Sequence, residues 1–205
     1  MNGFLARWRR TSRRPSGVLY QYYATIHPET CGVCLDHHGR ILERPEGEET
    51  PPLHPGCRCS LLEFSAGELE YYREQERRMR GRAQEELRRR RLFREGEEAL
   101  ARGDFEGALA RFRESVQIDV FTSDVEHLCR GESPRGALES APEVAQQLRD
   151  LFVRAYRWKH DLPKYRHMPE RMRLERRDHG LRVIRELFAP FVDGPAGGSG
   201  DVPPM

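Results

Sequence analysis

The chain contains 205 residues, which is enough for one ordinary domain or two small ones. Charged residues make up 33% of it and hydrophobic residues only 37%, so we expect a thin apolar core divided among small units. No run of about 18 apolar residues is present, and no apolar stretch follows the basic N-terminus, which excludes a membrane-spanning helix and argues against a secretion signal. We therefore expect a cytoplasmic protein with reduced thiols and no membrane partner.

The net charge of +2 conceals an uneven distribution of charge along the chain. Residues 1–28 carry five arginines and no acid, and residues 154–186 are rich in arginine and histidine. Residues 1–19 are predicted to form a basic arm. Because such segments bind phosphates or acidic protein surfaces, nucleic acid is one candidate partner, and a solvated charged face is the alternative.

A cysteine-rich module is predicted at residues 20–64. The stretch from Val18 to Ile26 overlaps its start, and the β-branched and aromatic side chains of this stretch indicate a short strand or a buried segment leading into the metal site. The middle of the module, residues 43–52, contains too much Pro, Gly and Glu for regular structure and is expected to be a loop.

The module contains four of the five cysteines, as Cys31-x2-Cys34 and Cys57-x-Cys59, and His54 lies three residues before the second pair. Two pairs of thiolates can close a tetrahedron around Zn²⁺ and so fold a segment that is too short for a hydrophobic core of its own. We expect zinc bound by Cys31, Cys34 and Cys57, with either Cys59 or His54 as the fourth ligand. Reduced structural thiols are the alternative.

The same residues also resemble a known family. CGVC, LDHHGRIL and PPLHPGCRCSL, within residues 20–62, resemble the C-terminal signature of the phage head morphogenesis (minor head) proteins. The resemblance implies a zinc module without catalysis that acts in protein assembly, with a portal or capsid component as partner, in a virion or in a prophage-derived relative. Family members carry a long helical region before the signature, whereas here the predicted helices follow it.

Two other functions are compatible with the module. Asp36-His37-His38 between the half-sites resembles an HNH nuclease, in which His37 or His38 would be catalytic beside a divalent metal. The asparagine of that motif is absent, because Asn2 is the only asparagine, and a polar turn is the plainer interpretation. A zinc module between arginine-rich segments also fits nucleic-acid binding without catalysis, with Trp8, Tyr22, Tyr23 and Trp158 available for stacking, although such rings are more often part of a core.

A long charged helix is predicted at residues 65–91. Ser65 and Glu68 have the spacing of a capping box, and Phe64 can pack against Leu69 as a hydrophobic staple. Arginine and glutamate on neighbouring turns then support an exposed helix through many weak ion pairs.

A helical domain is predicted at residues 92–189, and residues 92–119 within it resemble a single tetratricopeptide repeat. The matching positions are Leu92, Gly96, Ala99, the turn Gly103-Asp104-Phe105, Ala108 and Phe112. One repeat cannot bury its own apolar face, so we expect this hairpin to pack on flanking helices.

The remaining segments complete a mostly α-helical prediction. Residues 120–141 are expected to be an irregular connector in which Cys129 is a small buried apolar residue. A second capping-box spacing, from Ser140 to Glu143, predicts a helix to about residue 159, and a last helix is predicted at 169–188. Residues 190–205 are predicted to be a disordered tail. The expected fold is a small zinc knot with a short β element, a long helix and a helical bundle.

Overall fold

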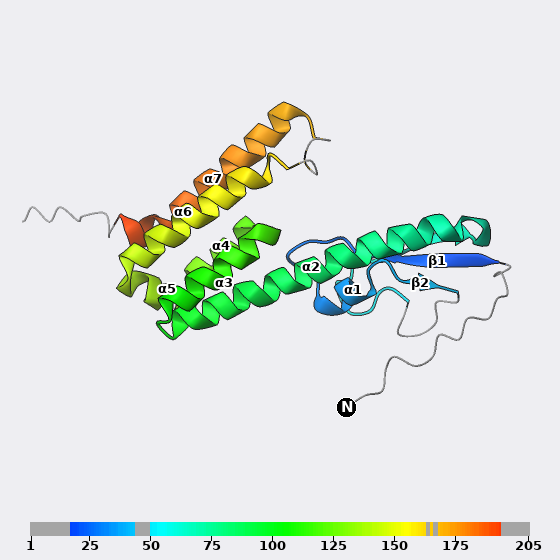
Figure 1. Ribbon diagram of the computed structural model, residues 1–205, viewed down its shortest axis with the longest axis horizontal. Helices are drawn as coiled ribbons and strands as arrows, with labels where there is room; N and C mark the ends of the chain where they lie inside the picture. Colours follow the sequence, from blue (N-terminus) through cyan, green and yellow to red (C-terminus); the bar gives the residue numbers. More distant parts are fainter. Residues whose placement is uncertain (1–16, 44–49, 163–164, 166–167, 194–205) are drawn as a thin grey trace, which may run out of the picture. The chain divides into compact units, whose positions relative to one another are not determined.

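The computed structural model describes residues 17–43, 50–162, 165 and 168–193, and the elements below belong to these residues (Figure 1). They form seven α-helices and one small three-stranded sheet, which confirms the mostly α-helical prediction with a short β element. The chain divides into unit 1 (residues 1–26 and 30–83) and unit 2 (residues 27–29 and 84–205). The predicted basic arm up to residue 16 and the tail from residue 194 lie outside the described residues.

Unit 1 is built on an antiparallel sheet with the strand order β2-β1-β3. Its strands are β1 (Val18–Tyr23), β2 (Ile41–Leu42) and β3 (Ser60–Ser65). The central strand β1 places Tyr20 opposite Leu42 on one side and opposite Glu63 on the other. Because side chains alternate along a strand, Gln21 and Tyr22 lie on opposite faces of the sheet, and both are buried.

The predicted capping box at Ser65 forms at the end of β3. The Glu68 carboxylate accepts hydrogen bonds from the Ser65 backbone N–H at 3.0 Å and from its hydroxyl at 2.8 Å. A single 3₁₀ turn, η2 (Ala66–Glu68), then leads into α2 (Leu69–Ala101). The ring of Phe64 stacks on Tyr72 of α2 with the ring centroids 3.9 Å apart, so this turn also packs the helix against the sheet.

Gly39 lies where the sheet and α2 approach each other most closely. Its N–H donates to the Tyr22 carbonyl at 2.8 Å, and its own carbonyl accepts from the buried Gln21 amide at 3.2 Å. Its φ is +88°, and a Cβ at this position would lie 2.9 Å from the Met79 Cβ. Only glycine satisfies both constraints.

Helix α2 is a single 33-residue element that enters both units. The helix predicted to end at residue 91 continues without a break to Ala101, so it is also the first helix of the predicted hairpin. The turn follows at Gly103, whose φ is +75°, and Asp104 caps α3 (Phe105–Ile118) by accepting from the Gly107 N–H at 3.0 Å. The predicted helical hairpin at residues 92–119 is therefore present.

The apolar face of this hairpin is closed by aromatic packing. Phe112 of α3 is fully buried, and its ring lies edge-on to that of Phe93 with the centroids 5.0 Å apart. Gly96 of α2 makes room for it, since a Cβ there would approach the Phe112 ring to 3.0 Å. Flanking helices cover the rest of the hairpin, as expected for an isolated repeat.

The prediction of an irregular connector at 120–141 was wrong. This segment forms α4 (Thr122–Arg130) and α5 (Glu132–Ser140). Pro134 lies in the first turn of α5, where a missing N–H costs no intrahelical bond. The two helices are stabilised by the burial of Val125, Leu128, Cys129 and Leu138 in the core of unit 2. Cys129 is 5% exposed, which confirms it as a small buried residue.

The second predicted capping box does not form. Ser140 is the last residue of α5, and its hydroxyl donates to the Ala137 carbonyl at 2.9 Å instead of capping the next helix. Helix α6 (Pro142–Lys159) begins at Pro142, which occupies its first position.

Helices α6 and α7 lie side by side, and both contribute side chains to the core of unit 2 (Figure 1). Helix α7 (Glu170–Val192) extends beyond the predicted end at Phe188 and contains Pro190, so the prediction of a disordered tail from residue 190 was wrong for residues 190–192. The rings of Phe152 and Phe188 meet between the two helices, with centroids 6.1 Å apart. No helix among the described residues combines the length and apolar character needed to cross a membrane.

Candidate metal centre

The first half of the candidate centre is formed by the short helix α1 (Gly32–His37). Cys31 caps this helix, and its Sγ accepts the Cys34 backbone N–H at 3.4 Å. One helical turn therefore places the two sulfurs on the same side. Cys34 is buried, at 2% exposure, whereas Cys31 is half-buried.

The second half precedes strand β3. The Cys57 N–H donates to the His54 carbonyl at 3.1 Å, which closes a tight turn through Gly56, whose φ is +78°. This turn places the His54 imidazole and the Cys57 thiol on one side of the loop. Cys59 directly precedes the first residue of β3, so the sheet holds its backbone in place.

All five predicted ligands lie together around Cys34. His54 Nε2 is 3.0 Å from the Cys31 sulfur and 3.2 Å from the Cys34 sulfur, and the sulfurs of Cys34 and Cys57 are 3.6 Å apart. The donor atoms form two groups, and within each group all of them lie within 4.8 Å of one another. One group is Cys31, Cys34 and His54, and the other is Cys34, Cys57 and Cys59. Cys34 belongs to both groups.

These distances suit a metal ion bound by sulfur and nitrogen. Zinc–sulfur bonds of about 2.3 Å and zinc–nitrogen bonds of about 2.0 Å place tetrahedral donors roughly 3.5–3.8 Å from one another. The separations of 3.0–3.6 Å are close to this range, so a metal requires only small movements of the side chains. Soft thiolates with one imidazole form a donor set that binds zinc in preference to magnesium or calcium.

The imidazole of His54 is oriented by the backbone. Its Nδ1 lies 2.8 Å from the Pro55 carbonyl oxygen, and since a carbonyl can only accept, Nδ1 carries the hydrogen. The other nitrogen, Nε2, then presents its lone pair to the Cys31 and Cys34 sulfurs when the ring is neutral. A backbone carbonyl commonly orients metal-binding histidines in this way.

The thiols perturb one another strongly. Burial, followed by the neighbouring Cys59 and Cys31 thiols, raises the pKa of Cys34. Burial also opposes ionisation of Cys57, but the backbone N–H groups of Cys59 and Leu53 outweigh it and lower the pKa of Cys57 to about 6. The neighbouring thiols cannot all be deprotonated unless a positive charge offsets the repulsion between the thiolates, and a bound divalent cation would supply that charge.

Tyr22, which the sequence suggests as a ring for stacking on nucleic acid, is instead a buried member of the site. It is fully buried beside the cysteines, and its hydroxyl has no hydrogen-bond partner among the described residues. Burial, followed by the Cys59 thiol, raises the pKa of Tyr22. Strand pairing places Tyr22 there, because it lies opposite Leu61, two residues after Cys59, and no local pattern in the sequence specifies this register.

The two histidines of the nuclease-like motif lie outside both donor groups. His38 is 4% exposed, and its Nδ1 accepts the Ala24 backbone N–H at 3.1 Å. Burial and then the charge of Arg82 lower the pKa of His38. His37 Nδ1 lies 2.9 Å from the Val33 carbonyl oxygen within the same helix. Both imidazoles therefore have a local structural partner.

Comparison of the whole chain with protein-family models, with curated proteins and with solved structures found no match. The function of the centre therefore has to be inferred from its residues. These are four thiols and one imidazole, from two segments of unit 1, gathered around a buried cysteine that could bind a metal ion.

Proposed function

We propose that this chain is a zinc protein and that its metal centre is structural, stabilising unit 1. The observation that carries the proposal is the convergence of four further donors, three thiols and one imidazole, on the thiol of Cys34 from segments 20 residues apart. Among the described residues, the buried apolar cluster at this site is Tyr22, Ala24 and Cys34, with five partly buried side chains packed against it. Zinc binding contributes about 10–16 kcal/mol to folding in comparable small modules, which is more than the burial of these three side chains can supply.

The ligand set proposed is Cys31, Cys34, His54 and Cys57. His54 Nε2 lies 3.0 and 3.2 Å from the Cys31 and Cys34 sulfurs, the Cys34 and Cys57 sulfurs are 3.6 Å apart, and His54 is already oriented by Pro55. Cys59 then lies outside the coordination sphere, where its sulfur can accept a hydrogen bond from the otherwise unpartnered Tyr22 hydroxyl. With four protein ligands the site has no open position, as in structural zinc sites.

Metal analysis of the purified chain tests this proposal. We expect one equivalent of zinc in the wild-type protein, and less than half an equivalent with a lowered melting temperature in Cys34→Ser and His54→Ala. Cys59→Ser is the matched control, because it removes a neighbouring thiol and is expected to keep the zinc. Wild-type protein without zinc would contradict the metal centre itself. Loss of zinc from Cys59→Ser but not from His54→Ala would contradict only the ligand set.

The resemblance of residues 20–62 to phage head morphogenesis proteins supports a role for the zinc unit in protein assembly. Its partner would be a portal or capsid component. Zinc-loaded wild-type protein is expected to bind such a component from the same source in a co-purification assay, and Cys34→Ser is expected to bind it less. Equal binding by both proteins, or by neither, would contradict this role.

Nuclease activity and simple nucleic-acid binding have distinct signatures. A nuclease would cut plasmid DNA in the presence of a divalent metal and lose this activity in His37→Ala or His38→Ala. Binding without cleavage would instead weaken steeply with salt and depend on the N-terminal arginines. The assembly role predicts neither behaviour.

A further inference from the structure

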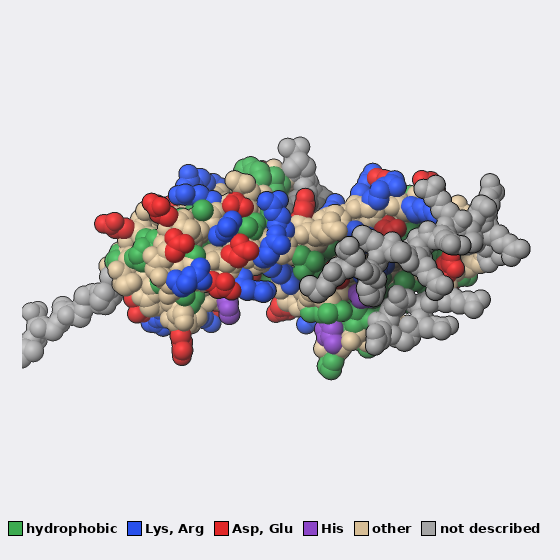
Figure 2. Space-filling model, turned by 60° about the horizontal axis from the view of Figure 1, so that its bottom comes forward, with side chains coloured by type: hydrophobic (Ala, Val, Ile, Leu, Met, Phe, Trp, Pro, Cys, Tyr) green, Lys and Arg blue, Asp and Glu red, His purple; other side chains and the backbone are tan. Residues whose placement is uncertain are grey.

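The surface arginines of unit 2 are mostly matched by nearby acids. Arg130 pairs with Glu126 at 2.7 Å, and Arg135 pairs with Glu139 at 2.8 Å. Figure 2 shows the resulting interleaving of acidic and basic side chains. Other arginines of unit 2, Arg185 among them, form no ion pair with the described residues, so the charge of a pocket depends on all the side chains that line it.

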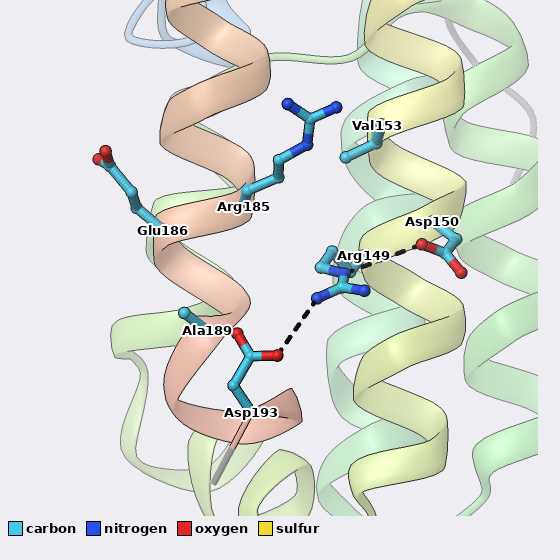
Figure 3. Close-up of a pocket in the computed structure, with 7 residues that line it drawn as sticks. All are labelled: Arg149, Asp150, Val153, Arg185, Glu186, Ala189 and Asp193. Carbon is cyan, nitrogen blue, oxygen red and sulfur yellow. Dashed lines mark ion pairs between the residues drawn. The ribbon is translucent and has the colours of Figure 1, made fainter. Parts of the chain in front are cut away.

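One pocket between α6 and α7 follows this pattern of matched charge (Figure 3). Arg149 points toward Asp193, at 3.9 Å, and also lies 3.8 Å from Asp150. Its guanidinium further donates to the Gln146 side chain at 2.7 Å. Two arginines and three carboxylates line the pocket, so it offers no excess positive charge to a ligand.

A second groove, between α3 and α6, differs in charge and in polarity. It has a volume of about 460 Å³, and its lining residues recur at helical spacing on the two helices. They are Arg113, Val116 and Gln117 of α3 and Leu151, Arg154, Ala155 and Trp158 of α6. No carboxylate lines this groove, and neither of its arginines forms an ion pair within the part of the chain that the structure describes.

The groove combines an apolar floor with an exposed indole. Val116 is buried at its base, and Leu151 and Ala155 are half-buried. Trp158 is 53% exposed, which is a large exposed apolar area for a folded surface. Exposed tryptophan and arginine beside aliphatic side chains are the residue types enriched at protein-binding hot spots.

We infer that the groove between α3 and α6 binds an acidic amphipathic segment of a partner protein. Apolar side chains of the segment would cover Leu151, Ala155 and Trp158, and its carboxylates would pair with Arg113 and Arg154. The occupant is a peptide rather than a nucleic acid because aliphatic side chains form the floor, and a single aromatic ring offers one stacking surface only. Residues 1–16 are excluded as the occupant by their own positive charge. This binding site is independent of the proposed zinc centre.

Tryptophan fluorescence tests the inference on the full chain. The chain contains two tryptophans, so in a Trp8→Phe background Trp158 is the only reporter. The probe is a synthetic peptide of about four helical turns with leucine at i, i+3, i+4 and i+7 and glutamate elsewhere. We expect saturable binding with a shift of the Trp158 emission to shorter wavelength. Arg113→Glu and Arg154→Glu should each weaken binding about tenfold.

Three controls make the result decisive. Arg185→Glu reverses an exposed arginine of the other pocket and is expected to change the affinity less than about twofold. A peptide with lysine in place of glutamate, and single-stranded oligothymidine, are expected to bind more weakly than the acidic peptide. Tighter binding of oligothymidine, no saturable binding of the acidic peptide, or self-association of the chain that covers Trp158 would each overturn the proposal.

Discussion

Replacing Arg89 by methionine is predicted to destabilise unit 2 severely, although the sequence suggests an ordinary surface arginine. The Arg89 side chain is 1% exposed and donates to both oxygens of Glu86 at 2.8 Å and to Asp124 of α4 at 2.6 Å. Its guanidinium also lies 4.7 Å from the centre of the Phe121 ring. Methionine fills a similar volume but leaves two partly or fully buried carboxylates without this partner.

The expected loss is about 3–5 kcal/mol in the free energy of unfolding at pH 7, as for other broken buried ion pairs. The matched control is Arg77→Met. Arg77 pairs with Glu74 on the same helix, but the two side chains are 67% and 41% exposed. Its loss should cost less than about 1 kcal/mol.

The pH dependence gives a second test of the same network. Burial raises the pKa of Glu86, but Arg89 and Arg90 more than offset this and hold it below its ordinary value. In the wild type, ionised Glu86 therefore stabilises the folded state at pH values above the ordinary pKa of glutamate, and this stabilisation is lost as the pH falls through the lowered pKa. Burial already raises the pKa of Asp124 in the wild type, although Arg89 opposes it. Without Arg89 the pKa of both carboxyls should be higher in the folded state than in the wild type, so both bind protons more readily when folded. The cost of Arg89→Met should therefore shrink between pH 7 and pH 5.

Urea unfolding of the two variants at both pH values measures these quantities. Replacing Glu86, Arg89 and Asp124 together by apolar residues should recover most of the lost stability, because no unpaired carboxylate remains buried. A loss for Arg89→Met no larger than that for Arg77→Met would refute the argument, and so would a loss that is unchanged or greater at pH 5.

Two further predictions concern single positions. Gly39→Ala should destabilise the protein by about 2 kcal/mol, because Gly39 has a positive φ and an added Cβ would contact Met79. Gly81→Ala, in open space on α2, should instead stabilise it by up to about 1 kcal/mol. Melting temperatures of the two variants that shift in the same direction would contradict this reasoning. Burial and then the neighbouring cations lower the pKa of His160, so the folded state favours its neutral imidazole. The stability that depends on this neutral form is present above about pH 6.5 and is lost as the pH falls toward the lowered pKa. Wild-type protein should therefore lose stability relative to His160→Phe between pH 7 and pH 5, and His179→Phe, at an exposed position, should behave as the wild type in the same urea titration.

Local signals predicted the parts of the fold that local chemistry controls. The Ser65 capping box and the turn at Gly103 form where the sequence places them, because each depends on a few neighbouring residues. The Ser140 box illustrates the limit of such signals. Its spacing is equally good, but the burial of Leu138 in the core extends α5 to Ser140, so its hydroxyl is not available to cap α6.

The metal centre was predictable as a set of residues but not as a geometry. Spacing alone brings the Cys31 and Cys34 sulfurs to one side of a helical turn, and Cys57 follows His54 in a tight turn. The choice between Cys59 and His54 depends on how the two segments meet, which the strands of the sheet control. The place of Tyr22 in the centre was missed for the same reason, since only strand pairing brings it beside Cys59.

The sequence by itself determined the helical class, the five soft donors and the hairpin, because periodicity, side-chain chemistry and glycine positions act over a few residues. Only the tertiary structure decided which charges are buried and which surfaces remain unmatched. Glu86 and Arg89 have the spacing of an exposed ion pair, and they become a buried network because Asp124, 35 residues after Arg89, packs against them. Arg113 and Arg154 likewise become the two unpaired charges of one groove only when α3 and α6 lie together. Burial and pairing are properties of long-range packing, and spacing along the chain does not specify them.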